Sequence, residues 1–513
     1  MLHLVFISSL LICSGLAAAQ TTFSTEYHGG TGDEAVDAVE DASGNLVVLG
    51  YVFSASNSDV VLSLMSPSGV LQQTYTYPTG EYEIPKSITS TSDGGYFITG
   101  SVFTNPSDYD LLLIKLDSTF NTVFRQRYSA GGNEYGNHGF EVAPGLYGVA
   151  GSMGLGGSAR PSYVIVDDNG DIRHEAYLNT NQFASPDFSG RYMGSGVTAL
   201  VHLTNAFTLL DSSGTVIGSC PTNIGLFTTD VLRTLTGGYA CIAASDYGAP
   251  LGGSLTLGII DSNLSSWTTG FKVRINAHEL LPVAMEQDGS GNIYIAANAT
   301  SLSSGNTFPL LIKADPGGNL LWSKSYNPPG SPGAAFRHLR ITADGGILLC
   351  GSSGPWNNQR LYVTKVDTAG TAPCNWTPYP LAPLPISSIG QTQHAPYSGT
   401  MPPPLVLTGN SVLLSLTTDA LCNGGGTGIG ETLPSTSLVH IRPTLFREYF
   451  SIESERGGVC EIEVFSSVGG RMNRFRAEIG EPVPAGSWPA GLYTFRVRLL
   501  SGETVILRAI HER

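Results

Sequence analysis

The sequence is poor in charge, and the charge that it has is mostly negative. Charged residues make up 13% of the 513 residues, with 41 Asp and Glu against 26 Lys and Arg, so the formal net charge is −15. Phosphate backbones are bound through a basic field, which argues against nucleic acid as a partner. The exception is the segment 438–513, which carries ten Arg and nine Glu. The acidity therefore belongs to the part of the chain that precedes this segment.

Long hydrophobic runs are also lacking. The one apolar run at the start of the chain, Leu4 to Leu16, is too short for a stable membrane anchor. It is followed by Ala17, Ala18 and Ala19, the small residues that a signal peptidase requires, so residues 1–19 read as a signal peptide cleaved between Ala19 and Gln20. We therefore expect a mature protein that is exported without a transmembrane anchor, either soluble or held at a surface by other means.

Cysteines are few, and none has the close spacing of a zinc site. Six remain after the signal peptide, and an exported chain permits disulfides among them. Cys374 and Cys422 bracket one Pro-rich segment and form the possible pair that we expect. Spacing leaves the other connectivities open.

Motifs of catalysis and of cofactor binding are missing as well. The sequence has no Gly-x-Ser-x-Gly elbow between a strand and a helix and no His-Glu-x-x-His. The calcium-loop spacing that begins at Asp167 fails, because Ile172 stands at the glycine position and Leu178 at the twelfth. We therefore expect no catalytic residue, no cofactor and no metal ligand.

What the sequence does contain is a repeat of about fifty residues. Its clearest copy runs from Asp93 to Tyr128 and holds Asp-Gly-Gly-Tyr, a strand closed by Gly100, and the strand Ile-Lys-Leu-Asp that ends at Asp117. Strands closed by a small residue recur at positions 50, 100, 151, 194, 244, 297 and 351. An aspartate ends the next strand in six copies, at positions 117, 167, 211, 261, 315 and 367. Two markers that keep step over seven copies indicate a repeat architecture.

Short strands separated by Gly, Asp and Asn turns predict an all-β fold, a β-propeller of seven blades over residues 20–376. Thr22 to Tyr27 resembles the third strand of a repeat and is placed in the closing blade, where strands from both ends of the chain meet. Eight blades stay an alternative, because the Pro-rich segment 377–422 is either an appended hairpin of Leu405–Thr408 with Val412–Thr417 or the remains of another blade.

A Gly-rich linker, 423–437, leads to a second unit, 438–513, whose short alternating strands predict a small antiparallel β-sandwich. Pro443 follows its first strand, and the strand before Gly470-Arg471 is hydrophobic. Gly491, Leu492 and Tyr493 open a late strand, and a basic strand ends the chain. This pattern resembles the C-terminal sorting domain of the type IX secretion system of Bacteroidota. The resemblance implies that the secretion machinery is a partner, and that the protein passes through the periplasm and is secreted or held on the outer cell surface. The Asp-Gly-Gly and Lys-Leu-Asp repeats likewise resemble propeller repeats found upstream of such sorting domains.

The repeated aspartates are interpreted as turn residues, because each ends a strand where its side chain accepts local backbone N–H groups. Tyr128, Tyr177, Phe271 and Tyr326 are expected to fill cores between blades. His138, His174, His202, His278 and His338 lie near strand edges, and some of them can converge on the propeller axis, although packed or solvated histidines are the simpler interpretation.

The functional expectation is an exported, non-enzymatic propeller that binds a protein or a glycan at the bacterial cell surface. Its binding loops are expected at one end of the ring, for instance Gly131 to His138 and Ser352 to Arg360. Two alternatives stay open. One is an extracellular hydrolase or lyase with its site at the propeller channel, since propellers also carry enzymes. The other is a structural component of a surface layer.

Overall fold

The computed structural model describes most of residues 20–384, the short strands between 395 and 420, and most of residues 439–511. The gaps before residue 384 are 30–31, 54–56, 106–107, 156–157, 180–189, 203–204, 221–226, 247–251, 266, 329–332 and 356–357. Ala19, Cys422, the linker 423–437, Pro443 and Gly470 lie outside the described residues. Every regular element in the described part is a strand, and none of it forms a helix that could span a membrane.

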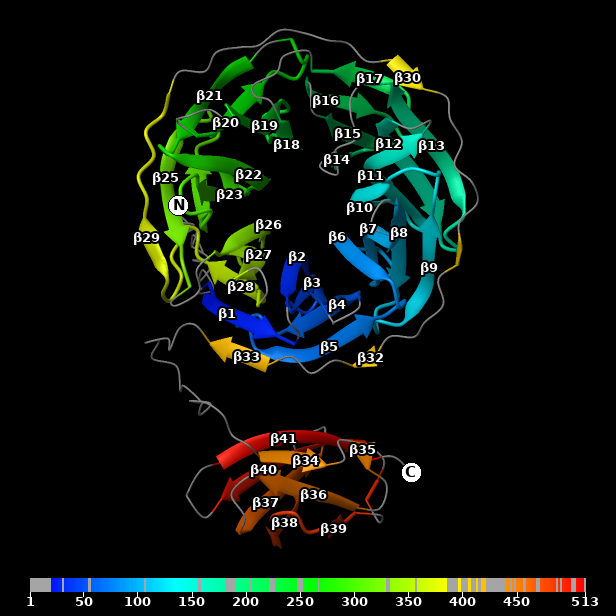
Figure 1. The fold of residues 1–513 in the computed structure, drawn as a ribbon, viewed down its shortest axis with the longest axis vertical. Helices are drawn as coiled ribbons and strands as arrows, with labels where there is room; N and C mark the ends of the chain where they lie inside the picture. The colour runs from blue at the N-terminus through cyan, green and yellow to red at the C-terminus, as the bar shows by residue number, and fades with distance from the viewer. Residues whose placement is uncertain are drawn as a thin grey trace, which may run out of the picture. The chain divides into compact units, whose positions relative to one another are not determined.

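The chain divides into two compact units, Met1–Gly425 and Gly426–Arg513. In the first unit, consecutive strands form four-stranded antiparallel sheets, which we call blades, and the described residues contain seven of them. The innermost strands of blades 1 to 7 are β2 (Asp33–Glu40), β6 (Tyr82–Ser90), β10 (Tyr135–Ala143), β14 (Gly190–Gly194), β18 (Phe227–Arg233), β22 (His278–Gln287) and β26 (Ala335–Ile341). Each contacts the next, and β26 contacts β2, so the ring is closed (Figure 1). The first unit is therefore an all-β propeller.

The remaining strands of each blade follow outward from the innermost one. They are β3 (Leu46–Phe53), β4 (Ser58–Met65) and β5 (Leu71–Tyr77) in blade 1; β7 (Tyr96–Asn105), β8 (Asp108–Leu116) and β9 (Thr122–Tyr128) in blade 2; β11 (Leu146–Leu155), β12 (Ser158–Asp167) and β13 (Ile172–Asn179) in blade 3; β15 (Val197–His202), β16 (Asn205–Leu210) and β17 (Val216–Ser219) in blade 4; β19 (Tyr239–Ser245), β20 (Ser254–Ile260) and β21 (Trp267–Arg274) in blade 5; β23 (Ile293–Ser301), β24 (Thr307–Ala314) and β25 (Leu320–Tyr326) in blade 6; and β27 (Ile347–Ser353) and β28 (Arg360–Val366) in blade 7.

The fourth strand of blade 7 comes from the N-terminus. β1 (Phe23–His28) pairs antiparallel with β28, with Phe23 opposite Lys365 and Tyr27 opposite Leu361. The predicted placement of Thr22 to Tyr27 in the closing blade is confirmed. Tyr27 is fully buried, and its hydroxyl donates to the carbonyl of Gly69 in blade 1. The closing strand β1 is therefore bonded to the rest of blade 7 and to blade 1.

The same tyrosine contact joins other neighbouring blades. Tyr77 donates to the carbonyl of Phe120 at 3.0 Å, and Tyr326 donates to that of Gly370 at 2.7 Å. Tyr128 donates in the same way to Gly170. In each case the acceptor lies in the turn that follows the third strand of the next blade, and it has a positive φ. Tyr128, Tyr177, Phe271 and Tyr326 are all buried, as expected for residues that fill the cores.

The described strands of the Pro-rich segment pair with outer strands of the ring, and the expected hairpin does not form. β31 (Leu405–Val406) pairs with β9 of blade 2, whereas β32 (Val412–Leu413) pairs with β5 of blade 1. Likewise β29 (Trp376–Pro378) joins β25, β30 (Ala395–Tyr397) joins β13, and β33 (Thr417–Ala420) joins β1. These strands, which we call the belt, add a fifth strand to five blades (Figure 1). An eighth blade is absent from the described residues.

The closing glycines of the repeat are explained by a bulge in each inner strand. Gly50, Gly100, Gly151 and Gly351 lie opposite Ala35, Pro85, Gly136 and Phe336, and in each pair the inner strand skips one residue after this position. The bulge brings the preceding carbonyl oxygen against the glycine. A Cβ on Gly151 would lie 1.9 Å from the Tyr135 oxygen, and one on Gly100 would lie 2.4 Å from that of Ile84. Side chains essentially never approach that closely, so glycine is required.

Two further residues of the repeat, the lysine of Ile-Lys-Leu-Asp and the aspartate of Asp-Gly-Gly, bind one another. Lys115, from Ile-Lys-Leu-Asp, is 1% exposed and reaches Asp93 of Asp-Gly-Gly at 2.8 Å, and Lys365 reaches Asp344 at the same distance. Burial would raise the pKa of Asp93, but hydrogen bonds from Lys115, Thr91 and Gly95 lower it to about 2. The repeated lysine and the Asp-Gly-Gly turn therefore form one structural unit.

The strand-ending aspartates act in turns, as predicted. Asp117 accepts hydrogen bonds from the backbone N–H groups of Thr119 and Asn121 at 2.8 and 2.9 Å. Asp167, Asp211, Asp261 and Asp367 each accept the corresponding pair of backbone bonds, and Asp315 accepts the second of them. These side chains replace hydrogen bonds that the turn cannot make with its own backbone.

The fourth copy of the repeat was aligned wrongly. Gly194 does not close a second strand, because it ends the inner strand β14 and opens the turn to β15 with a φ of 80°. β14 spans only Gly190–Gly194, and its irregular pairing falls between Tyr192 and Gly194. The glycines of this short turn resembled the marker in the sequence.

The second unit is a β-sandwich whose two sheets are mostly antiparallel. One contains β34 (Val439–Arg442), β36 (Tyr449–Ser454) and β39 (Val483–Pro484); the other has the order β35 (Leu445–Phe446), β41 (Thr504–His511), β40 (Gly491–Leu499), β37 (Val459–Ser466) and β38 (Arg471–Glu478). β35 and β41 are parallel. The core includes Phe450, Ile462 and Phe495. Tyr493 packs on Trp488 with ring centroids 5.2 Å apart, and its hydroxyl donates to the carbonyl of Pro489 at 2.6 Å. Gly491 and Leu492 begin β40, and Arg471 begins β38.

Candidate functional site

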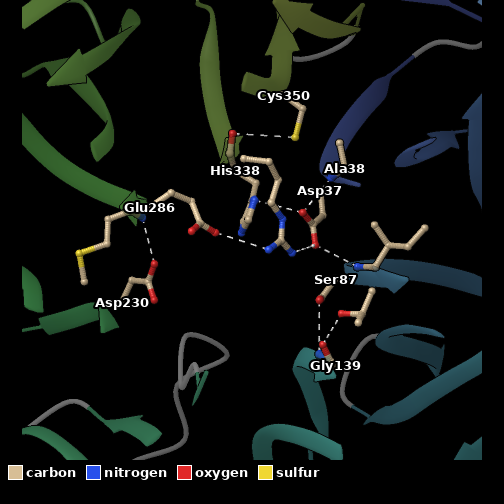
Figure 2. A network of polar contacts seen from close by, with 12 residues as sticks. Asp37, Ala38, Ser87, Gly139, Asp230, Glu286, His338 and Cys350 are labelled. Carbon is tan, nitrogen blue, oxygen red and sulfur yellow. Dashed lines mark hydrogen bonds and ion pairs between the residues drawn. The ribbon is translucent and has the colours of Figure 1, made fainter. Parts of the chain in front are cut away.

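The bulges place ionisable side chains at equivalent positions on four inner strands. In blades 1, 3, 5 and 7, the inner strand resumes its pairing directly after the bulge. The residues at this position are Asp37, His138, Asp230 and His338. Figure 2 shows Asp37, Asp230, Glu286 and His338 converging from their blades. Because the innermost strands surround the axis of the ring, these side chains form a charged cluster there.

The charges in this cluster alternate and are bonded to one another. Arg340 reaches Asp37 at 3.6 Å and Glu286 at 3.4 Å. Arg191 in turn reaches Glu286 at 2.6 Å and Asp230 at 3.2 Å. The resulting order, Asp37–Arg340–Glu286–Arg191–Asp230, joins blades 1, 7, 6, 4 and 5. We call this set the axial ion-pair chain.

Backbone groups and a histidine complete the bonding of its two terminal carboxylates. The N–H of Ile88 donates to Asp37 at 2.9 Å, and His338 Nδ1 lies 3.0 Å from the same carboxylate. The N–H of Met285 donates to Asp230 at 2.9 Å. Both end groups are thus held by more than their arginine.

The surroundings shift the pKa values of the cluster. Burial works against the charged form of Asp37, but His338 and Arg340 outweigh it and lower the pKa of this carboxyl. Burial raises the pKa of Asp230, with Arg191 opposing. For His138, burial and the positive Arg340 and Arg191 lower the pKa to about 3, and burial also lowers the pKa of His338. Both imidazoles are therefore neutral at pH 7.

The arrangement does not present an obvious nucleophile. The Cys350 sulfur lies 4.0 Å from the His338 carbonyl oxygen, and burial raises the pKa of its thiol well above the usual range, so a reactive thiolate is disfavoured. Ser87 accepts a hydrogen bond from the N–H of Gly139 at 3.3 Å (Figure 2). Among the residues that the structure describes, no group of three or more His, Cys, Asp or Glu has the geometry to hold a metal ion.

The two expected binding loops lie at the ends of strands next to this cluster. Ser352 donates to Glu34 at 3.1 Å, and Arg360 pairs with Glu26 at 3.1 Å. In the other loop, Glu134 is fully buried and accepts a hydrogen bond from the N–H of Gly154 at 3.2 Å. Parts of both expected loops therefore brace the ring instead of facing solvent.

Of the five histidines noted in the sequence, His138 and His338 approach the axis. His174, His202 and His278 lie on β13, at the end of β15 and at the start of β22. The axial ion-pair chain was not predicted. Its sequence signal is weak, because β2 and β18 carry other polar residues besides Asp37 and Asp230. The partners Arg191, Glu286 and Arg340 come from three further blades, and only ring closure brings them together.

Replacing Arg191 with Met should destabilise the propeller by about 3 kcal/mol, because Glu286 and Asp230 then lose a partner that balances their buried charge. Chemical denaturation at pH 7 measures the loss. Arg173→Met is the matched control. Its ion pair with Asp167 involves an arginine side chain that is 56% exposed, and removing such a pair costs under about 1 kcal/mol. Equal effects of the two variants would contradict a structural role for the axial chain.

A second set of buried carboxylates lies where the inner strands of blades 1 to 3 begin. Asp33, Glu83 and Glu134 each come two residues before the residue that pairs with the closing glycine, and all three are fully buried. Glu83 accepts a hydrogen bond from the N–H of Val60 at 3.2 Å. Burial raises the pKa of Glu83 to about 7 and that of Glu134 to about 8.

A raised pKa in the folded state makes stability fall with rising pH. The contribution of Glu83 is fully present below about pH 4.5 and is lost as the pH rises through about 7. Gln stays neutral, so Glu83→Gln should match the wild type near pH 4 and exceed it by about 3 kcal/mol at pH 9. Denaturant titrations at both values test this. Glu81→Gln, at a carboxylate that is 31% exposed, is the control. A stability gain for Glu83→Gln that does not depend on pH would contradict the assignment.

Comparison with known proteins finds structural similarities at low sequence identity. No protein-family model and no curated protein matches the chain. Among solved structures, the WD40 β-propeller domain of Doa1 is 10% identical, covers 67% of this chain and 96% of its own, and has a TM-score of 0.42. The α-L-arabinanase of Penicillium chrysogenum, solved with arabinobiose, is 12% identical, with coverages of 68% and 98% and a TM-score of 0.37. The extracellular domain of a hybrid two-component system from B. thetaiotaomicron is 10% identical, with coverages of 94% and 70% and a TM-score of 0.28.

Proposed function

We propose that this protein is an exported, non-enzymatic β-propeller that binds a protein or a glycan at the bacterial cell surface. The observation that carries the proposal is the axial ion-pair chain. Each of its carboxylates, Asp37, Glu286 and Asp230, is already bonded to an arginine, so the ring centre is built to hold blades together. Recognition then falls to the loops at the ends of the ring, where propellers vary most freely.

Delivery through the type IX secretion machinery is the second part of the proposal. The residues of the resembling motif have places that suit a folded signal. Tyr493 is 3% exposed and is fixed by Trp488 and Pro489, so the Gly-Leu-Tyr element anchors the start of β40. The separate compact unit Gly426–Arg513 suits a signal that a receptor reads without unfolding the propeller.

The export experiment compares the full chain with a chain ending at residue 437, both produced in a bacterium with a type IX system. We expect the truncated protein to accumulate in the periplasm and the full chain to reach the surface or the medium. A reporter fused to residues 426–513, with its own signal peptide, should be exported. Normal release of the truncated chain would overturn the assignment.

Binding is tested by pull-down with immobilised residues 20–513 against surface proteins and a glycan panel. Retention of a specific partner supports the proposal, and retention of none counts against it. No nucleic acid is expected to bind, because residues 1–437 carry a formal charge of −16 (the total of −15 less the +1 of residues 438–513).

We also propose that Cys374 and Cys422 form a disulfide that closes the belt. Cys220, Cys241, Cys350 and Cys460 are buried and form no disulfide, so they do not compete for this pairing. Cys374 precedes β29 on blade 6, and Cys422 follows β33 on blade 7. The bond would thus join the two ends of the belt on neighbouring blades.

Replacing both cysteines with Ser should lower stability by about 2–4 kcal/mol, because a cross-link restricts the unfolded chain. Non-reducing peptide mapping tests the bond directly, and limited proteolysis of the belt tests its effect. Cys460→Ser controls for loss of a buried thiol outside the propeller. A map without the 374–422 peptide pair would refute the bond.

The pairing of His338 with Asp37 favours one second candidate, a hydrolase that uses His338 as a base. A carboxylate that orients a neutral imidazole is a common catalytic arrangement. Activity screening of the wild type against His338→Gln would decide this. A hydrolytic activity that disappears in the variant while the fold persists would support the enzyme.

A further inference from the structure

The belt strands bind the blades in the reverse of the order in which the blades follow along the chain. β29 lies on blade 6, Leu384 bridges to Lys272 of blade 5, and β30, β31 and β32 lie on blades 3, 2 and 1. β33 then pairs with β1, the closing strand of blade 7. Figure 1 shows the belt strands, in yellow to orange, at the outer edges of their blades. The belt and Leu384 together therefore contact six of the seven blades.

The middle strands of the belt are too short to hold their places alone. β30 pairs over three residues, and β31 and β32 pair over two residues each. So short a ladder forms few hydrogen bonds, and these must offset the conformational entropy that the strand loses when it docks. Even an isolated two-stranded hairpin is at best marginally stable in water. The docking of these strands must therefore draw on their connection to the rest of the belt.

Short connections along the chain supply that support. Seven residues separate β30 from β31, five separate β31 from β32, and three separate β32 from β33. An extended chain spans at most about 3.6 Å per residue, so a docked strand keeps the next one within about 30 Å of itself. The next strand then binds in an intramolecular step, at a high effective concentration. Loss of one strand removes this advantage from its neighbours as well.

The first strand of the belt is held by side chains as well as by its backbone. Trp376 Nε1 donates to the Ala372 carbonyl at 3.0 Å, and Lys324 Nζ lies 3.9 Å from the centroid of the Trp376 ring. The N–H of Tyr379 donates to the Ser323 carbonyl at 2.9 Å. A cation over an indole face is a favourable contact. β29 is therefore a firm attachment for the strands that follow it.

The last strand of the belt is the longest, and it lies on the strand that closes the ring. β33 pairs with β1 over four residues, from Thr25 opposite Ala420 to His28 opposite Thr417. The other edge of β1 pairs with β28. Detachment of β33 would leave the outer edge of β1 bare, so the belt and the closure of the ring meet at the same strand.

We propose that the belt is a single strap, whose strands leave and rejoin the blades together and thereby couple blades that do not touch one another. The proposal goes beyond the proposed binding function and does not depend on it. Damage to one belt strand should then loosen belt strands on other blades. Five independent pairings would behave differently, because each would respond only to a change at its own blade.

The test is amide hydrogen exchange of residues 20–513, read by mass spectrometry on peptides that contain the belt strands. The variant Leu405→Pro/Val406→Pro breaks β31, because adjacent N–H groups point to opposite edges of a strand and one of the two must face β9. Leu405→Ala/Val406→Ala keeps both N–H groups and is the matched control. We expect exchange in β33, two blades away, to become about tenfold or more faster in the proline variant and to stay within about twofold of the wild type in the control.

Exchange in β12 of blade 3 reports global unfolding and should not change in either variant. If it rises in the proline variant, Thr418→Pro/Asp419→Pro in β33 takes its place, with β31 as the strand that is read. Global unfolding of both proline variants beside a folded alanine control would equally show that one belt strand supports blades that it does not touch. Faster exchange confined to β31 and β9, or equal acceleration in the proline and alanine variants, overturns the strap and leaves the proposed function standing.

Discussion

A chain that begins at Gly29 instead of Gln20 should no longer unfold cooperatively. The deletion removes β1, so blade 7 keeps only three strands and the outer edge of β28 becomes bare. It also removes Phe23 and Tyr27, which are 7% and 0% exposed. Burial of two large side chains and the lost ladder bonds together amount to about 5 kcal/mol or more, a large part of the stability of an ordinary domain. Calorimetry should show a broad transition at lower temperature.

Ring closure, and not the mere loss of nine residues, explains the size of the expected stability loss. β1 is paired on both edges, with β28 on one side and the belt strand β33 on the other. The Tyr27 hydroxyl adds the bond to Gly69 of blade 1. A peptide of residues 20–28 added in trans should therefore restore part of the transition. A truncated protein with an unchanged melting curve would refute the placement of β1.

The substitution Tyr27→Phe tests the contribution of the hydroxyl apart from that of the strand. It should cost about 1–2 kcal/mol, because the Gly69 carbonyl loses its buried donor. Tyr82→Phe is the matched control, since the Tyr82 hydroxyl makes no hydrogen bond to another described residue. Equal effects would show that the hydrogen bond from Tyr27 to Gly69 contributes little to stability.

The repeat was predictable because its markers are local. Asp117 and its relatives bond to the backbone two and four residues further on, and that geometry recurs wherever the same turn recurs. Gly100 is required by the close approach of the Ile84 carbonyl oxygen within the same sheet. Each blade therefore leaves the same residues at the same spacing, and the N-terminal strand was recognised by the same pattern.

The belt and the axial ion-pair chain were not predictable for a shared physical reason. β31 and β32 contain two residues each, too few for any hydrophobic period, and their partners β9 and β5 lie hundreds of residues earlier in the chain. Arg191 and Glu286 are likewise brought together only by the closed ring. The repeat position in blade 4 was predicted wrongly for a different reason. Its inner strand is short, and Gly194 in the following turn has the spacing of a closing glycine.

Gly351→Ala should be among the most damaging single substitutions in the propeller. A Cβ at this position would lie 1.9 Å from the Ala335 carbonyl oxygen and 2.9 Å from the Phe336 Cα. All of the nearest atoms belong to the backbone, so no side chain can rotate away. The bulge of β26 would have to shift, and with it His338, which follows the bulge and faces Asp37. We expect a loss of about 3 kcal/mol, at the upper end for overpacked sites.

The measurement is denaturant unfolding of Gly351→Ala beside Gly289→Ala. Gly289 has no other atom within 4 Å of its added Cβ and no positive φ, so its substitution should change stability by less than about 0.5 kcal/mol. Blade 6 has Ala297 at the corresponding place, opposite Pro282 and beside a bulge of the same kind, so a methyl group is accommodated where the backbone leaves room for it. The cost in blade 7 comes from the particular position of the Ala335 carbonyl oxygen, 1.9 Å from the added Cβ. A harmless Gly351→Ala would mean that this bulge relaxes freely, and the closing glycines would then need another explanation.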